Sequence, residues 1–442
     1  ATHLAAKAQE ANDANLFAAL ARHQERADDK ARAAQSYLTA AQQRAEGDPQ
    51  SSASLYANYL RLATAEGLSP HTIAQHRLVY AEILFRDGRF TQAQSELDQA
   101  LVESSGDIPL TANGQITKSR IALVSGERSV ARALLREAEA HLRSHGHQPA
   151  LLAQALGLRG SLKRADGAHE DAHAMHSEAL ALYRELGDLE GEGEALCFLC
   201  TDLSVSADNA TRTQYLKQAK LLERALVCYR ASHNRLGEIK TLTNLGILYV
   251  HNLDDLPQGL DYLRSACQLA HAIGYHTFEA QLLPDLAEAL MLSGHIDAAG
   301  AAYTHALRAL EETQNMLWLP VALTSAAYYQ RLVLGDFDRA NALLNRADAL
   351  LAEDGDPWDV AYVLCERGLL YIACGQPYDD HLARIEAHFA QQPGLGKPPN
   401  HHTLMKAHEA LQRGEPLFRG NCLQEIPDGL KRAIPGLCFE NE

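Results

Sequence analysis

An alanine recurs at nearly constant spacing along most of this chain, and each time it closes the same short pattern. Nine such positions align, namely Ala40, Ala100, Ala138, Ala179, Ala225, Ala266, Ala306, Ala347 and Ala387. The successive gaps are 60, 38, 41, 46, 41, 40, 41 and 40 residues. Such a period is typical of stacked helix-turn-helix units, because each unit is too small to bury its apolar face alone. We therefore predict an all-α fold, a solenoid of about nine helical hairpins of roughly 40 residues.

The pattern within one unit is clearest between residues 286 and 306. Its positions are Leu286, Ala287, Leu290, Gly294, Ala299, Tyr303 and Ala306. The first three share one face of a helix, the glycine is placed to end that helix, and the last three form the buried stripe of a second helix. Gly88, Gly167 and Gly375 hold the same turn position in other units.

Composition and charge narrow the class of protein. The chain has 56 acidic and 40 basic residues, and its net charge of −16 is spread along its length, which disfavours nonspecific binding to nucleic-acid phosphates. It has no uninterrupted apolar run of about 18 residues, the length that a membrane helix needs. We read no secretion signal at the start and no disulfide framework in the eight cysteines. We therefore expect a cytoplasmic protein with no nucleic-acid partner, no membrane partner and no cofactor.

The order of a small residue, an aromatic residue and an alanine resembles the tetratricopeptide repeat (TPR) over about residues 16 to 390. The usual TPR unit has about 34 residues, and most units here are six or seven residues longer. Long units of this kind resemble the sensor arms of large bacterial signalling ATPases, including activators of the maltose-regulon type. This resemblance implies that the solenoid is a right-handed superhelix and that it serves as a regulatory array that binds a ligand or a partner protein.

Two shorter segments strengthen the likeness to bacterial signalling proteins. Residues 20–29 and 33–38 are similar to the segment that opens the repeat region behind the ATPase module of multidomain cyclases and serine/threonine kinases. Residues 414–420 and 426–430 are similar to the segment that closes such kinase-linked arrays. The chain also begins without Met, so we expect it to be part of a longer protein with an ATPase or kinase module on its N-terminal side.

Two breaks in the period and a change of composition divide the chain. We predict a repeat array over residues 1–390, with an extra helix near 54–66 and a polar insertion near 204–213. From residue 391 the composition changes to a Pro- and Gly-rich loop, which a short helix follows. Because the last unit of an array needs a polar or covering cap, we predict that residues 391–442 form a C-terminal cap.

One motif suggests enzyme chemistry. His169-Glu170-Asp171-Ala172-His173 matches the H-E-x-x-H pattern of zinc peptidases, in which two histidines hold zinc and the glutamate activates water. The repeat phase argues against this function, because it places His169 at a packing position and His173 at an outward position. A zinc hydrolase is therefore kept only as a remote alternative, and His176 is predicted to be a packing residue.

Other chemical signals are weak or missing. Cys197 and Cys200 have C-x-x-C spacing, but no second pair accompanies them, so we interpret them as small packing residues. The chain contains no phosphate-binding G-x-x-x-x-G-K-[ST] loop, no G-x-S-x-G motif and no kinase H-R-D set. We expect that the array is not an enzyme and that any catalytic module lies outside these 442 residues.

The resemblance also indicates where a partner would bind. In TPR arrays the first helix of each unit lines the concave groove, at set positions relative to its small marker residue. In this sequence those positions hold Glu82, Arg120, Arg164, Thr201, Lys240, Thr243, Gln281, Glu288, Tyr328 and Arg331. The arginines and lysine among them suggest a groove that clamps a peptide carboxylate or an acidic helix, although these side chains could instead be solvated or pair with neighbours.

These observations predict a docking or sensing arm that regulates an attached ATPase or kinase module. The alternative is a stand-alone TPR scaffold or peptide receptor without an output domain.

Overall fold

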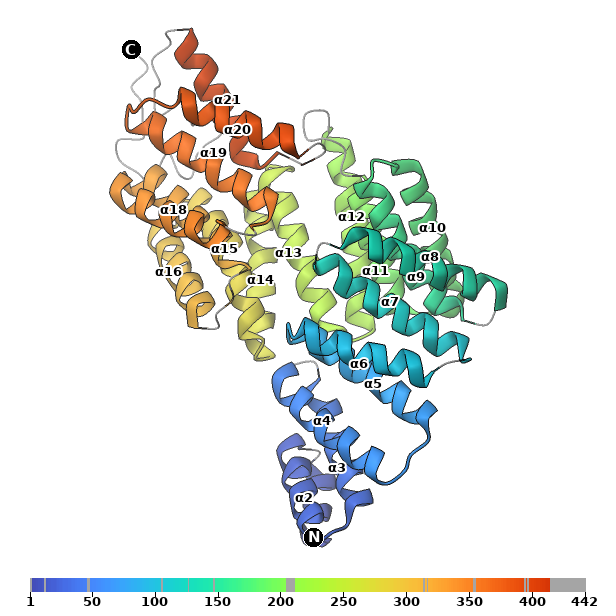
Figure 1. Cartoon of the computed structure of the whole chain (residues 1–442). Helices are drawn as coiled ribbons and strands as arrows, with labels where there is room; N and C mark the ends of the chain where they lie inside the picture. The colour runs from blue at the N-terminus through green and yellow to red at the C-terminus, as the bar shows by residue number, and fades with distance from the viewer. Residues whose placement is uncertain are drawn as a thin grey trace. The chain divides into compact units, whose positions relative to one another are not determined.

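The computed structural model describes residues 2–11, 13–45, 48–104, 106–125, 127–145, 148–203, 211–312, 315, 317–352, 355–392, 395 and 397–413. In these parts of the chain the structure contains 21 α-helices, one π-helical segment and no strand (Figure 1). The predicted all-α repeat fold is confirmed. None of the described helices is long and apolar enough to cross a membrane.

The first of two compact units comprises residues 1–202. Its helices are α1 (Thr2–Ala11), α2 (Ala14–Arg26), α3 (Lys30–Arg44), α4 (Pro49–Ala65), α5 (Pro70–Arg86), α6 (Phe90–Glu103), α7 (Ile108–Val124), α8 (Arg128–His145), α9 (Pro149–Ala165), α10 (His169–Leu186) and α11 (Leu189–Asp202). Three hairpins, α5/α6, α7/α8 and α9/α10, follow one another. Helix α4 packs on α3 and spans the stretch in which we predicted an extra helix, although it begins earlier, at Pro49.

The second unit comprises residues 203–442. Its helices are α12 (Arg212–Ala231), α13 (Arg235–His251), α14 (Leu256–Ala272), α15 (His276–Leu292), α16 (Ile296–Glu312), α17 (Leu319–Tyr329), the π-helical segment η2 (Gln330–Leu334), α18 (Phe337–Leu351), α19 (Pro357–Ala373), α20 (Asp379–Gln391) and α21 (Pro399–Gln412). Three hairpins, α13/α14, α15/α16 and α17/α18, again follow one another, and α19 contacts α18, α20 and α21.

Eight of the nine recurring alanines are buried, each with at most 1% of its surface exposed. Seven of them lie in α3 or in the second helices of the hairpins, which pack against the helices that precede them, and Ala225 lies in α12, which packs against α13. The ninth differs, because Ala387 in α20 is exposed. The buried face of α20 instead consists of His381, Leu382 and Ile385, which puts Ala387 out of phase. The ladder of buried alanines therefore ends at Ala347.

Glycines shape the hairpins in two ways. Gly88, Gly167, Gly294 and Gly375 follow first helices with φ angles of +77°, +81°, +82° and +66°, a left-handed conformation that glycine adopts without strain. These turns were predicted. Where α13 crosses α14, a Cβ added to Gly259 would lie 2.9 Å from the carbonyl oxygen of Gly246, so this crossing requires a residue without a side chain.

Parts of two predicted segments lie outside the described residues. Of the polar stretch at 204–213, residues 204–210 are outside. Thr211 then caps the N-terminus of α12 with a capping box. Its hydroxyl accepts from the backbone N–H of Gln214, and the Gln214 side-chain oxygen accepts from the backbone N–H of Thr211. Residues 414–442, including the kinase-array likeness at 414–420 and 426–430, are also outside. The C-terminal cap stays a prediction.

The different environments of Ala306 and Ala387 predict different responses to a larger side chain. Ala306→Leu inserts three carbons into a fully buried crossing, so we expect it to lower the free energy of unfolding by about 1–3 kcal/mol. Ala387→Leu has nearly the same effect on helix propensity but adds its carbons at an exposed position, so we expect a change within about 0.5 kcal/mol. Urea denaturation monitored by circular dichroism measures both. Equal losses would contradict the assigned register of α20.

Candidate functional site

The residues predicted to line the groove lie on the first helices of hairpins or on the helices that continue that row. In the first unit they are Glu82 on α5, Arg120 on α7, Arg164 on α9 and Thr201 on α11; in the second they are Lys240 and Thr243 on α13, Gln281 and Glu288 on α15, Tyr328 on α17 and Arg331 on η2. These helices contact one another in sequence, from α5 to α7, α9 and α11, and separately from α13 to α15, α17 and α19.

In the first unit two of the three predicted charged residues bind each other. An Arg120 guanidinium nitrogen lies 2.7 Å from a carboxylate oxygen of Glu82, which joins α7 to α5, and the same guanidinium lies 4.9 Å from the Phe85 ring. Arg164 is half-buried, and its Nε has no hydrogen-bond partner among the described residues. The exposed Thr201 hydroxyl donates to the Phe198 carbonyl on its own helix.

On α13 and the start of α15, the predicted residues also have local partners. The Lys240 ammonium lies 6.0 Å from the centre of the Phe278 ring on α15. Thr243 is buried, and its hydroxyl donates to the carbonyl of Ile239 on the same helix. Gln281 is half-buried on α15. Lys240 therefore contacts the next first helix, whereas Thr243 is satisfied within its own helix.

Further along the row, carboxylates and tyrosines from three successive helices gather. We call this set the acidic wall: Asp285 and Glu288 of α15, Tyr328 of α17, Arg331 of η2, and Tyr362 and Glu366 of α19. Sequence analysis included only Glu288, Tyr328 and Arg331. Two of the others share a position that the sequence could have indicated. Asp285 and Glu366 each lie two residues before the small residue of the first helix, Ala287 or Gly368.

One buried ion pair organises the acidic wall. Nε of Arg331 lies 2.6 Å from one Glu366 oxygen, and a terminal guanidinium nitrogen lies 3.2 Å from the other. The two side chains are only 8% and 2% exposed. Arg331 lies in the π-helical segment η2, a local widening that is frequent at functional sites, and its guanidinium lies 5.5 Å from the Tyr328 ring. The bidentate contact orients Arg331 toward α19 rather than toward a ligand carboxylate.

Negative charge exceeds positive charge in the acidic wall, because Arg331 balances one of its three carboxylates. His251 of α13 has its Nε2 3.9 Å from a Glu288 carboxylate oxygen. Burial and the neighbouring Glu288 carboxylate raise the pKa of Asp285 to about 7. Burial and Glu288 also raise the pKa of Tyr362, whose hydroxyl lies 3.3 Å from the Ser325 hydroxyl.

A ligand could reach these groups from solvent. Asp285, Glu288, Tyr328 and Tyr362 are all partly exposed although many side chains surround them. Behind them, the Tyr303 hydroxyl of α16 is buried without a hydrogen-bond partner among the described residues. The second unit therefore presents partly desolvated acceptors and aromatic rings together, an arrangement suited to a positively charged group.

The H-E-x-x-H segment lies in the first two turns of α10. His169 is exposed, so its predicted packing position is wrong, and His173 is exposed with its Nδ1 3.6 Å from Asp202. His176 is fully buried, as predicted, with its Nδ1 2.8 Å from Asp202 and its Nε2 3.0 Å from the Gly157 carbonyl oxygen. Its two ring nitrogens thus connect α10 to α11 and to α9.

Cys197 and Cys200 lie on α11, and Cys200 is buried. Burial raises the pKa of the Cys200 thiol to about 12. Because the thiolate is the form that binds metals and attacks electrophiles, this shift disfavours both reactions at neutral pH. In the described part of the chain, three metal-ligand side chains do converge at the turn between α14 and α15, in His271, His276 and Glu279.

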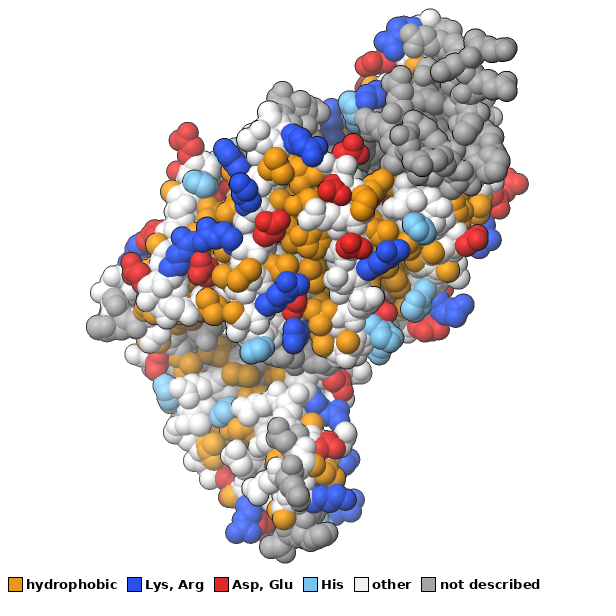
Figure 2. All heavy atoms as spheres, turned by 180° about the vertical axis from the view of Figure 1, so that it is seen from behind, with side chains coloured by type: hydrophobic (Ala, Val, Ile, Leu, Met, Phe, Trp, Pro, Cys, Tyr) orange, Lys and Arg blue, Asp and Glu red, His pale blue; other side chains and the backbone are white. Residues whose placement is uncertain are grey.

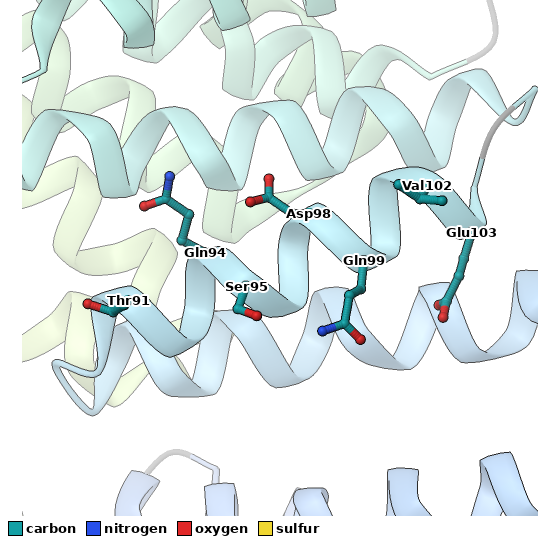
Figure 3. A pocket seen from close by; sticks show the side chains of 7 residues that line it. All are labelled: Thr91, Gln94, Ser95, Asp98, Gln99, Val102 and Glu103. Atoms are coloured by element: carbon teal, nitrogen blue, oxygen red, sulfur yellow. The ribbon is translucent and has the colours of Figure 1, made fainter.

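A shallow hollow of about 570 Å³ lies on α6, a second helix rather than a first one. Figure 3 shows its seven lining side chains, all from this helix. Two of its carboxylates are held by basic residues, Asp98 by Lys118 at 2.6 Å and Glu103 by Arg77 at 3.1 Å. On the face of the molecule in Figure 2, acidic and basic side chains are likewise interspersed among hydrophobic ones. The two carboxylates of this hollow thus already have basic partners within the protein.

The fold resembles solved structures, although no protein-family profile and no curated protein matches the sequence. A signal transduction ATPase with numerous domains (STAND) and a tetratricopeptide repeat sensor, from Pyrococcus horikoshii, is 13% identical with a TM-score of 0.54. That match covers 81% of this chain and 53% of the STAND protein, so this chain spans about half its length.

Two shorter proteins resemble this chain over almost their whole length. The apo form of the quorum sensor NprR from B. thuringiensis is 14% identical with a TM-score of 0.53, over 83% of this chain and 99% of NprR. A Rap protein in complex with competence and sporulation factor is 13% identical with a TM-score of 0.52, over 86% and 98% of the two chains. The chain is thus a TPR-like helical repeat array, as its sequence resemblance implied.

Removing one partner of the buried pair should be far more destabilising than removing one partner of an exposed pair. Glu366→Gln leaves the Arg331 charge buried without its counter-ion, so we expect a loss of about 3–5 kcal/mol in the free energy of unfolding. The control is Glu311→Gln, whose partner Arg346 is half exposed and for which we expect a loss of about 0–1 kcal/mol. Chemical denaturation measures both, and similar losses would contradict the burial of the Arg331–Glu366 pair.

The raised pKa of Asp285 predicts a pH-dependent stability. Between about pH 4 and pH 7 the unfolded chain loses this proton while the folded chain retains it, so folding becomes less favourable as the pH rises. Asp285→Asn removes this penalty. At pH 8 we expect its free energy of unfolding, measured by urea denaturation, to exceed that of wild type by on the order of 1–3 kcal/mol, with the difference shrinking toward pH 4. The exposed Asp261→Asn is the control, and a pH-independent difference for Asp285→Asn would contradict the assignment.

Proposed function

We propose that this chain is the ligand-sensing or partner-docking arm of a signalling protein, and that its acidic wall binds a positively charged group of a protein or peptide partner. The observation that carries the proposal is the pair of partly exposed carboxylates, Asp285 and Glu288. Burial and mutual repulsion raise the pKa of Asp285 to about 7. A lysine, an arginine or a terminal amine placed there would neutralise carboxylate charge that the Arg331 guanidinium, which pairs with Glu366, leaves unbalanced.

The geometry favours a basic group over the acidic ligand that the sequence suggested. Arg120 is paired with Glu82, and Arg331 is paired with Glu366 in a buried bidentate contact. A ligand carboxylate would have to displace these internal partners. A ligand cation instead meets carboxylates and the rings of Tyr328 and Tyr362, whose faces attract cations.

Proton exchange would accompany this binding. At neutral pH Asp285 is protonated in part of the molecules, because its pKa is about 7. An incoming cation favours the ionised carboxylate, so Asp285 releases its proton as the ligand binds. The affinity should therefore fall as the pH drops from about 8 to about 5.

The fold supports a sensing role. One compared structure is a STAND protein with a TPR sensor, another is a quorum sensor, and a third is a Rap protein complexed with competence and sporulation factor. A ligand that bridges α15, α17 and α19 would favour one arrangement of successive hairpins, and an attached ATPase or kinase module would respond to the shifted population. The alternative is a stand-alone TPR scaffold, which would bind the same ligand without an attached output.

Selection from a display library of random peptides tests the ligand class. We expect the bound peptides to be enriched in lysine and arginine, and we expect the double variant Asp285→Asn/Glu288→Gln to weaken the best binder. A charge-assisted hydrogen bond contributes about 1.5–3 kcal/mol, so the Kd should rise by roughly 10- to 100-fold. Titration calorimetry at pH 8 and pH 5 measures this change and its pH dependence.

The control is Glu82→Gln in the first unit, which removes a carboxylate from the same kind of helix without touching the acidic wall. Its binding should match that of wild type. Enrichment of acidic peptides would favour the arginine clamp inferred from the sequence. Basic peptides that bind the double variant as tightly as wild type would move the site elsewhere, and failure to select any peptide would count against a peptide-binding role.

A further inference from the structure

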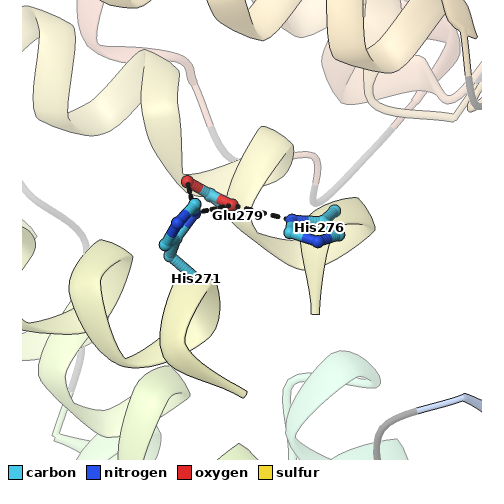
Figure 4. A group of neighbouring side chains, drawn as sticks. All are labelled: His271, His276 and Glu279. Carbon is cyan, nitrogen blue, oxygen red and sulfur yellow. Dashed lines mark hydrogen bonds and ion pairs between the residues drawn. The ribbon is translucent and has the colours of Figure 1, made fainter. Parts of the chain in front are cut away.

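We propose that the turn between α14 and α15 is a binding site for a divalent transition-metal ion, most suitably Zn²⁺, with His271, His276 and Glu279 as ligands. Figure 4 shows the two imidazole rings on either side of the Glu279 carboxylate. One ligand atom from each residue lies within 4.8 Å of the others. This inference is independent of the proposed function and goes beyond it, because the acidic wall uses none of the three residues.

The local sequence brings the three side chains together across a tight turn. His271 lies in the last turn of α14, Gly274 takes a φ of +72°, and His276 is the first residue of α15. The turn is closed by a hydrogen bond from the Tyr275 amide to the Ala270 carbonyl at 2.9 Å. Glu279 follows one turn into α15, so its carboxylate lies beside both rings.

The distances are close to those of a zinc site. Nδ1 of His271 lies 3.1 and 3.2 Å from the two Glu279 oxygens, and Nδ1 of His276 lies 3.3 Å from one of them. Bonds of about 2.0–2.2 Å in a tetrahedral site place neighbouring ligand atoms roughly 3.3–3.5 Å apart. The carboxylate already lies at this spacing from each ring, and because the three ligand atoms lie within 4.8 Å of one another, side-chain rotation would bring them to one ion.

The Nδ1 atoms of both histidines can exchange a hydrogen bond to Glu279 for a bond to a metal ion. Without metal, each Nδ1 carries a proton and donates it to the Glu279 carboxylate. With metal, the neutral tautomer protonated at Nε2 presents the Nδ1 lone pair to the ion. Solvent can move the proton, because the His271 and His276 side chains are 70% and 69% exposed.

The ligand set also indicates the kind of metal. Two imidazoles and one carboxylate suit Zn²⁺ and its neighbours in the transition series, whereas Mg²⁺ and Ca²⁺ prefer sites made of oxygen atoms. Glu279 is only 14% exposed, so a cation would compensate a carboxylate that is largely removed from water. Three protein ligands leave the fourth tetrahedral position open to water or to a partner's side chain.

A metal ion here would connect two successive hairpins. His271 ends α13/α14, while His276 and Glu279 begin α15/α16. The ion would fix the start of α15 relative to the end of α14, next to Phe278, over which Lys240 lies. The bound ion should therefore protect the turn at residues 273–275 from hydrogen exchange.

The test is a titration of the full chain with Zn²⁺ alone under reducing conditions, followed by calorimetry and by hydrogen exchange. We expect one high-affinity equivalent in wild type that is lost in His271→Ala/His276→Ala, together with metal-dependent protection of residues 273–275. The chain has 21 histidines, so a control must show that the loss is specific to this pair. The matched control is His169→Ala/His173→Ala, which removes two exposed histidines from the H-E-x-x-H segment of α10 and should still bind one Zn²⁺ ion tightly.

Cobalt substitution and a milder variant separate the remaining outcomes. Co²⁺ should give visible absorption typical of nitrogen and oxygen ligands, without a thiolate charge-transfer band. Glu279→Gln keeps a polar partner for both rings but removes the charge, and it should weaken Zn²⁺ binding even if the double histidine variant folds poorly. Three results would each overturn the site. They are tight Zn²⁺ binding that survives in His271→Ala/His276→Ala, tight Zn²⁺ binding that is lost in the α10 control, and a thiolate charge-transfer band with Co²⁺.

Discussion

Close contact between helices through very small side chains is the constraint on which the rest of this structure depends. Ala306 and Ala347 are fully buried where second helices meet first helices, and a side chain on Gly259 would collide with the Gly246 backbone. At such crossings the helices cannot rotate without inserting a larger side chain between them. The crossing therefore determines which face of each first helix packs within its hairpin and which face is left to meet the next first helix.

The faces of the first helices that do not pack within their hairpins carry charged side chains, and some of these form ion pairs between successive first helices. Glu82 with Arg120 is a partly exposed pair, whereas Arg331 with Glu366 is almost completely buried. An exposed pair contributes about 0–1 kcal/mol, while a buried pair is costly to break because one charge would stay without a partner. The buried pair therefore specifies how η2 and α19 face each other. Among the described residues, Asp285 has no ion pair, and Glu288 has only the more distant His251.

Helix α15 connects the two sites that we propose. Its first turn carries His276 and Glu279, and its middle carries Asp285 and Glu288, so a ligand at either site would act on the same helix. Pro284, which lies inside this helix, removes one backbone donor between the two groups. A metal ion at the turn and a basic group at the acidic wall would therefore both constrain the orientation of α15 between its neighbouring hairpins.

The amino-acid sequence by itself determined the repeat and most of its turns, because a period of about 40 residues and the Gly and Ala positions record local packing within one hairpin. It also placed the residues predicted to bind a partner on first helices, except Arg331 on the π-helical segment after α17, and it placed His176 in the core. It misplaced Ala387 and His169, because spacing alone cannot show that α20 is out of phase or that a position at a helix start is exposed. Only the tertiary structure decided which polar side chains contact one another. Arg331 with Glu366 and His271 with Glu279 are contacts between different helices, and their distances depend on how the helices cross.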